Sequence, residues 1–247
     1  MNANFKDLIK MYATTKSGKN RLFEILITIL TCGKGIPYGE LLNYLQKLID
    51  KGLSVEDEMC LECFENFIIN YTQLNSGGTE AFSCEPIEKL AINLAQASPN
   101  YESGYQGNFK KLREYAKRII KLVNDCVTIQ KSEYLASIAI AVTHHYIDTN
   151  EFFKLGRCIS NLTDEDLDYL KDNINTDIIY KDEDYIEDFL AVGILYEVDG
   201  GYAFNERAFK LKKYALYYNT DETIEIPKSY PKRHRGLFIG DVKPTGE

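Results

Sequence analysis

Apolar residues recur at helical spacing along most of residues 1–160. In residues 109–130 they stand three and four positions apart and mark one face of a long helix. Residues 133–147 are apolar nearly all round, and Ser132 can cap their start, so this segment is predicted as the central helix of a bundle. Shorter amphipathic stretches predict further helices over residues 3–13, 21–32, 40–50, 55–74 and 86–97.

The pattern changes after residue 160. Thr163 is a good N-cap for a helix over residues 164–174, whose first turn is acidic. A second amphipathic helix is predicted over residues 181–195, and the stretch 195–205 then alternates around Asp199-Gly200-Gly201, as in two strands joined by a tight turn. A closing helix is predicted over residues 206–218.

These patterns predict a mainly α-helical protein. A helical bundle over residues 1–160 is followed by a winged-helix-like unit over residues 161–219, which contains a small β-hairpin. Residues 220–247 contain three prolines and are predicted to form an extended tail.

Charge is distributed unevenly along the chain, whose formal net charge is −8. Residues 1–160 balance 18 basic against 18 acidic side chains, whereas residues 161–200 carry 2 basic and 13 acidic ones. The local field of this acidic block decides what can approach it. Because a helix that reads DNA depends on Lys and Arg contacts to phosphate, we expect the block to repel duplex DNA.

The helix expected before the ribbon carries the acidic residues that we assign to a protein partner: Asp182, Asp184, Glu187 and Asp188. Lys181 is the basic residue that opposes them within the helix. An internal role is the alternative, because the closing helix could bind this acidic face within the fold through its own cations, Arg207, Lys210, Lys212 and Lys213.

Two basic segments offer an alternative surface for an anionic ligand such as nucleic acid. The first is the polar face of the helix over residues 109–130, formed by Lys110, Lys111, Arg113, Lys117, Arg118 and Lys121. Such a face can meet phosphate or anionic lipid, although a charge block is more often a solvated face or pairs with an opposite block of the same chain. The second is the basic tail over residues 228–235, "KSYPKRHR".

Residues 13–20, "ATTKSGKN", nearly match a phosphate-binding loop. That loop needs a strand before it and a hydroxyl residue after its lysine. Here a predicted helix precedes the segment, and Asn20 replaces the hydroxyl residue. We therefore expect an ordinary helix start capped by Ser17.

Cys60 and Cys63 form a C-x-x-C pair. A zinc site of this type needs a second close pair or two regularly spaced histidines, and the chain offers neither pattern. His144 and His145 are adjacent on a helix predicted to be buried, so one of them should face the core. We expect neither zinc nor a redox dithiol, and we interpret the cysteines with apolar neighbours as small core residues: Cys32, Cys126 and Cys158.

No nucleophile stands on a recognisable elbow, and the carboxylates over residues 164–188 form a run on helix surfaces rather than an acid–base pair. The sequence therefore predicts a non-enzymatic binding or regulatory protein without a cofactor, and an enzyme whose catalytic side chains meet only in the folded chain is a further alternative. The segment "MNANFKDLIKMYATTK" lacks the apolar core of a secretory signal, and the longest apolar run, residues 25–30, is too short to span a bilayer. We expect a cytoplasmic protein with free thiols.

Residues 130–215 resemble the C-terminal layout of the bacterial abortive-infection alpha family. The segments that carry the resemblance are "QKSEYLASIAIAVTHHYID", "LGRCISNLTDEDLDYLKDNI" and "LAVGILYEVDGGYAFNERAFKL". Asn205 stands where the wing pattern of the family often has Thr. The resemblance implies a role in phage defence or mobile-element biology, without catalytic residues to carry over.

Overall fold

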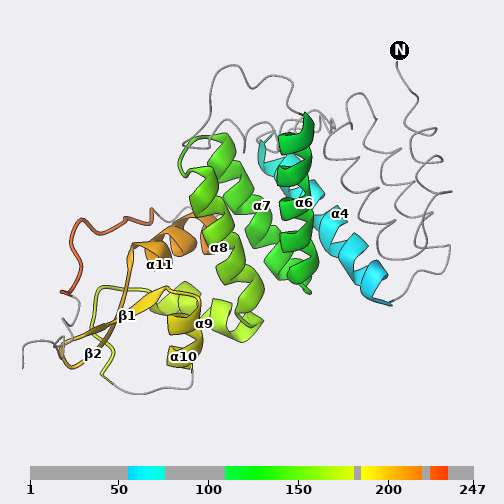
Figure 1. Ribbon diagram of the computed structural model, residues 1–247. Helices are drawn as coiled ribbons and strands as arrows, with labels where there is room; N and C mark the ends of the chain where they lie inside the picture. The colour runs from blue at the N-terminus through cyan, green and yellow to red at the C-terminus, as the bar shows by residue number, and fades with distance from the viewer. Residues whose placement is uncertain (1–54, 76–108, 181–184, 219–222, 233–247) are drawn as a thin grey trace, which may run out of the picture.

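The computed structural model describes residues 55–75, 109–180, 185–218 and 223–232. These parts of the chain are mostly helical, with a two-stranded antiparallel hairpin towards their C-terminal end (Figure 1). The predicted class, a mainly α protein with a small hairpin, is confirmed. The helices expected before residue 55 and over residues 86–97, the loop-like segment 13–20 and Cys32 lie outside the described residues.

Four helices form the bundle: α4 (Val55–Asn75), α6 (Phe109–Asp125), α7 (Ile129–Thr143) and α8 (Thr149–Asn161). Helix α7 packs against α4 and α8, and α6 packs against the same two helices (Figure 1). Every residue from Leu135 to Val142 is buried, which confirms the nearly all-apolar segment as the central helix.

The predicted single helix over residues 109–130 is wrong at its C-terminal end. Helix α6 stops at Asp125, and Thr128 rather than Ser132 caps α7 by accepting a hydrogen bond from the backbone amide of Lys131. Between the two helices Val127 takes a φ of 49°, and the amide of Thr128 donates to the carbonyl of Cys126 at 2.6 Å. Apolar spacing continues through this turn, so the periodicity alone gives no sign of it.

Helix α7 ends in a Schellman motif at the two adjacent histidines. The amide of Tyr146 donates to the carbonyl of Ala141, the amide of His145 donates to that of Val142, and His145 takes a left-handed φ of 59°. Both His144 and His145 lie past the helix and are exposed, so the expectation that one of them faces the core is wrong. The cap reverses the chain and leaves the Tyr146 side chain 62% exposed.

Helix α9 (Asp164–Asn173) begins as predicted at Thr163, whose side chain forms a capping box with Asp166. Helix α10 (Tyr185–Ala191) ends before the predicted residue 195, because Gly193 takes a φ of 72° and closes a second Schellman motif. Strands β1 (Leu195–Val198) and β2 (Gly201–Phe204) then pair, with Leu195 opposite Phe204. The predicted turn at Asp199-Gly200 is confirmed.

The segment between α9 and α10 adds one bridge to the free edge of β2. Ile179 and Tyr202 exchange two backbone hydrogen bonds of 2.8 and 2.9 Å. The approach is so close that a Cβ atom on Gly201 would lie 2.1 Å from the carbonyl oxygen of Ile179. Gly201 therefore allows this segment to reach the hairpin.

The predicted closing helix begins at Asn205, the N-cap of α11 (Glu206–Leu211), and continues as the π-helix η1 (Lys212–Leu216). The amide of Tyr217 donates to the carbonyl of Lys212 at 2.9 Å, the five-residue spacing of a π-turn. Both α11 and η1 pack on the bundle, α11 against α8 and η1 against α7. One cluster of buried side chains accordingly runs from Cys60 to Leu216, across the predicted boundary at residue 160. No helix in the described ranges has the length and apolar character needed to cross a membrane.

Candidate functional site

The structure describes two of the four residues predicted to bind a protein partner. Glu187 and Asp188 lie in the first turn of α10 and are exposed, whereas Asp182 and Asp184 lie outside the described residues. Further exposed carboxylates stand on α9 and β1, and together with the α10 pair they define the acidic surface: Glu165, Asp168, Asp172, Glu187, Asp188 and Glu197. Within the described part of the chain, these six carboxylates take part in no ion pair.

Among the described residues, the cations of the closing helix bind other partners, and none of them pairs with Glu187 or Asp188. Lys210 pairs with Glu206 at 2.8 Å and with Glu151 at 3.5 Å. Arg207 donates from Nη1 to the carbonyls of Val192 and Gly193 at 3.4 and 3.1 Å. Lys212 donates to the carbonyl of Ile174 at 3.2 Å, and the Nζ atom of Lys213 lies over the ring of Tyr214.

Arg207 and Lys212 therefore act at the C-terminal ends of α10 and α9. The last carbonyls of a helix lack intrahelical partners and carry partial negative charge, which a cation satisfies. Gly193 is part of this arrangement, because a Cβ atom there would lie 2.8 Å from Nη1 of Arg207. The two cations hold α9 and α10 to the closing helix, and among the described residues neither forms an ion pair with the acidic surface.

The alternative basic face on α6 is partly described. Lys117, Arg118 and Lys121 are exposed, and the helix also contains Lys110, Lys111 and Arg113. The guanidinium of Arg118 lies 3.5 Å from the ring centroid of Phe153 on α8. Burial and, to a lesser extent, the like charge of Arg157 lower the pKa of Arg118. Arg157 on α8 therefore extends the basic face, which only the packing of α6 on α8 reveals.

The cysteines of the described residues are buried. Cys60 and Cys63 lie one turn apart on α4, and the thiol of Cys63 donates to the carbonyl of Thr128. Burial, the main cause, raises the pKa of Cys126 to about 12 and that of Cys158 to about 11. Cys126 and Cys158 are therefore confirmed as core residues, and high pKa values keep their thiols protonated and unreactive. No group of three potential metal ligands gathers among the described side chains.

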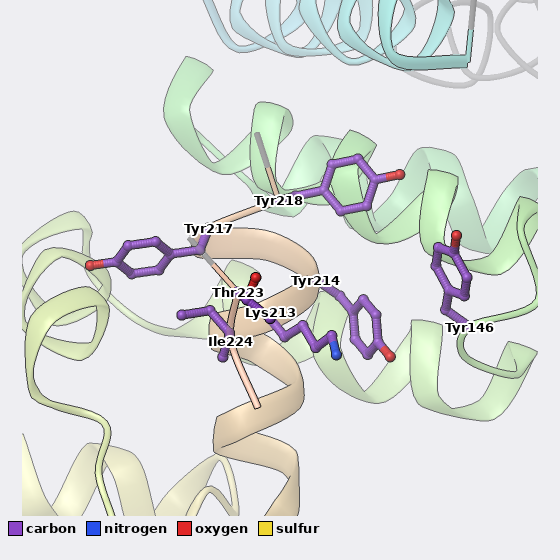
Figure 2. Close-up of a pocket in the computed structure, with 7 residues that line it drawn as sticks. All are labelled: Tyr146, Lys213, Tyr214, Tyr217, Tyr218, Thr223 and Ile224. Atoms are coloured by element: carbon purple, nitrogen blue, oxygen red, sulfur yellow. The ribbon is translucent and has the colours of Figure 1, made fainter. Parts of the chain in front are cut away.

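A pocket that was not predicted from the sequence lies at the end of η1 (Figure 2). We call it the tyrosine pocket; it has a volume of about 350 Å³ and is lined by Tyr146, Lys213, Tyr214, Tyr217, Tyr218, Thr223 and Ile224. The π-turn supplies Lys213 and Tyr214 to its wall, and the chain that leaves η1 supplies Tyr217 and Tyr218. Tyr146 arrives from the turn after α7, through the left-handed cap at His145.

The rings in the tyrosine pocket are arranged in two groups. Tyr146 and Tyr214 are stacked, with ring centroids 6.2 Å apart and planes inclined by 16°, and Lys213 Nζ lies 5.7 Å from the Tyr214 centroid. Tyr217 points away from this pair (Figure 2), towards the ammonium groups of Lys171 and Lys212. Burial, the larger cause, and the neighbouring Tyr146 raise the pKa values of Tyr214 and Tyr218, so both phenols are hydrogen-bond donors at neutral pH.

Part of this pocket has a signal in the sequence. Tyr214, Tyr217 and Tyr218 recur at helical spacing beside two lysines, and 18 tyrosines are unusual in a chain of this length. Nothing local indicates that Tyr146 joins them, since that contact depends on how the end of α7 meets η1.

No protein-family model matches the chain, and comparisons with curated proteins and with solved structures find no match. The resemblance to the abortive-infection alpha family therefore stays a prediction that rests on the quoted segments.

Proposed function

We propose that this protein is a non-enzymatic binding protein that acts through protein–protein contacts, with residues 161–219 as a winged-helix-like contact unit. The observation that most supports this proposal is the exposure of the α10 carboxylates. Glu187 and Asp188 are exposed and form no ion pair with any described residue, while Arg207 and Lys212 are bound to backbone carbonyls.

The order of elements also supports the winged-helix-like interpretation. Helix α9, the bridge at Ile179, helix α10 and the β1–β2 hairpin follow one another in that order. In a winged helix that reads DNA, the helix before the ribbon presents Lys and Arg to phosphate. The described part of α10 presents Glu187 and Asp188 instead, which favours a basic segment of a protein partner.

A charge-reversal experiment tests the proposal. The full chain carrying Glu187→Lys and Asp188→Lys is compared with a control that carries Glu114→Lys and Asp125→Lys, two exposed carboxylates on and at the end of α6. Both variants change the charge by the same amount. We expect a basic partner captured stoichiometrically from extract to be retained by the wild type and the control and to be lost by the α10 variant. A partner set that is identical for all three proteins would refute the assignment of the acidic surface.

Nucleic-acid binding through α6 is the second candidate, and Arg157 is the observation that favours it. With Lys117, Arg118 and Lys121 it gives a basic face that spans two helices. A gel shift with duplex and single-stranded probes at low salt tests this role, with Lys117→Glu and Lys121→Glu as the variant. Phosphate contacts require a shift that weakens as salt rises, so the absence of a salt-sensitive shift would eliminate the candidate.

A role in phage defence follows from the family resemblance alone. Plating of phage on bacteria that express the chain, with the α10 double variant beside it, tests this role directly. We expect protection by the wild type and its loss in the variant, whereas equal plating on all strains would count against it.

A further inference from the structure

We propose that the tyrosine pocket binds a small planar aromatic anion, of the chemical class of the nucleoside monophosphates. The pocket and the acidic surface share no residue, although Tyr217 donates a hydrogen bond to Asp172, and the inference does not depend on the proposed protein partner.

The polar groups of the pocket select for an anion. The described residues of its lining offer the ammonium of Lys213, the phenols of Tyr214 and Tyr218 and the hydroxyl of Thr223, and none of these described residues is an Asp or Glu. Within the described residues, Lys213 has no carboxylate partner. A phosphate oxygen accepts hydrogen bonds from all of these donors, and its charge complements the ammonium.

The aromatic side chains select for a planar ring. Tyr146 and Tyr214 already lie nearly parallel, and Tyr146 leaves 62% of its surface to solvent. A nucleobase can extend such a stack, because every base offers a π-face to a tyrosine ring. Tyrosine cages elsewhere bind quaternary ammonium groups, but the charge of Lys213 disfavours a cation at this site.

Size and backbone geometry agree with a small ligand. The volume of about 350 Å³ lies near the lower end of the range for ligand pockets and suits one nucleotide better than a dinucleotide. Lys213 and Tyr214 stand in η1, and single π-turns within helices occur frequently at functional sites. Figure 2 shows Lys213 extending towards the same side as Tyr146 and Tyr214, so one ligand can contact the ammonium and the stacked rings together.

Isothermal titration of the full chain tests the proposal, with adenosine monophosphate, adenosine and inorganic phosphate as separate probes. If ring and anion are both recognised, adenosine monophosphate binds at least about tenfold more tightly than either adenosine or phosphate. No heat of binding at about 1 mM adenosine, guanosine, cytidine or uridine monophosphate would overturn the proposal. Binding of a single-stranded oligonucleotide without binding of any mononucleotide would also overturn it and would indicate a nucleic-acid site instead.

Variants locate the binding. Tyr146→Ala is expected to weaken binding about tenfold through lost stacking, and Lys213→Gln about tenfold through the lost charge–phosphate contact. Tyr146→Phe keeps the ring and should bind within about twofold of the wild type. Tyr180→Ala removes a tyrosine that is 74% exposed and does not line the pocket, and serves as the matched control. Equal affinity in the wild type, Tyr146→Ala and Lys213→Gln would place any observed binding outside the pocket and refute the assignment.

Discussion

Replacing Gly201 with alanine should detach the segment between α9 and α10 from the hairpin. The added Cβ would lie 2.1 Å from the carbonyl oxygen of Ile179 and 3.1 Å from a methyl group of Ile178. Because a carbon and an oxygen that are not bonded cannot lie that close, the segment between α9 and α10 must move away. It then loses both hydrogen bonds between Ile179 and Tyr202. Each such bond contributes about 1 kcal/mol net, so the variant should lose about 2 kcal/mol of unfolding free energy.

The neighbouring Gly200 provides a matched control within the same turn. Its φ of 89° strains an alanine, but the nearest atom to its Cβ position is a Tyr180 ring carbon at 3.7 Å, an ordinary contact. Gly200→Ala should therefore cost about 1 kcal/mol of conformational strain without disturbing the bridge. The two variants separate the steric effect at one glycine from the backbone effect at the other.

Urea denaturation followed by circular dichroism gives the two free energies, and amide hydrogen exchange gives the mechanism. In thermal unfolding we expect the Tm of Gly201→Ala to fall by about 4–8 °C. Amide hydrogen exchange should be faster at Ile179 and Tyr202 in that variant only. If the Tyr202 amide stays protected in Gly201→Ala, or if the variant is no less stable than Gly200→Ala, then the bridge does not hold the segment and the reasoning fails.

Three further predictions concern caps and buried thiols. His145→Gly should stabilise the protein by about 1 kcal/mol, measured by urea denaturation, because glycine adopts the φ of 59° without strain. A loss of stability would contradict a left-handed cap of α7 at this residue. Arg207→Met should cost about 2 kcal/mol by leaving the carbonyls at the end of α10 unpaired, whereas the exposed Arg157→Met should change stability by less than about 0.5 kcal/mol. Burial holds the pKa of folded Cys126 near 12 against an ordinary 9.0, so the unfolded thiol loses its proton first and stability falls as pH rises between these values. Between pH 8 and pH 10, the loss of unfolding free energy should be about 1.4 kcal/mol smaller in Cys126→Ala than in the wild type. Equal losses in the two proteins would show that this thiol does not contribute to the pH dependence of stability.

Local signals in the sequence were sufficient where one residue type determines the backbone. Thr163 marks the start of α9 through its side-chain oxygen, and the Asp199-Gly200 pair marks the hairpin turn. The nearly all-apolar segment at Leu135–Val142 is central in the bundle, because a helix without a polar face must be covered on all sides.

The sequence was insufficient to predict the structure where tertiary packing imposes a backbone conformation that the residue type disfavours. Val127 and His145 both take positive φ values, which no β-branched or ordinary side chain prefers, so neither helix end could be predicted from residue type. The tyrosine pocket depends on Tyr146 meeting Tyr214 across two separate elements. The acidic surface could be predicted from composition, but only the structure shows that Arg207 and Lys212 are bound elsewhere.

Lys212 connects two regions that lie far apart in sequence. Its ammonium binds the carbonyl that ends α9 and lies 5.4 Å from the ring of Tyr217, and its backbone carbonyl accepts the bond that closes η1. A protein that binds α9 and displaces its end would therefore disturb the Lys212 ammonium and, through it, Tyr217 in the wall of the tyrosine pocket. Thermodynamic linkage makes such an effect mutual. If the bound protein changes the affinity of the tyrosine pocket for a small molecule by some factor, the small molecule changes the affinity for that protein by the same factor.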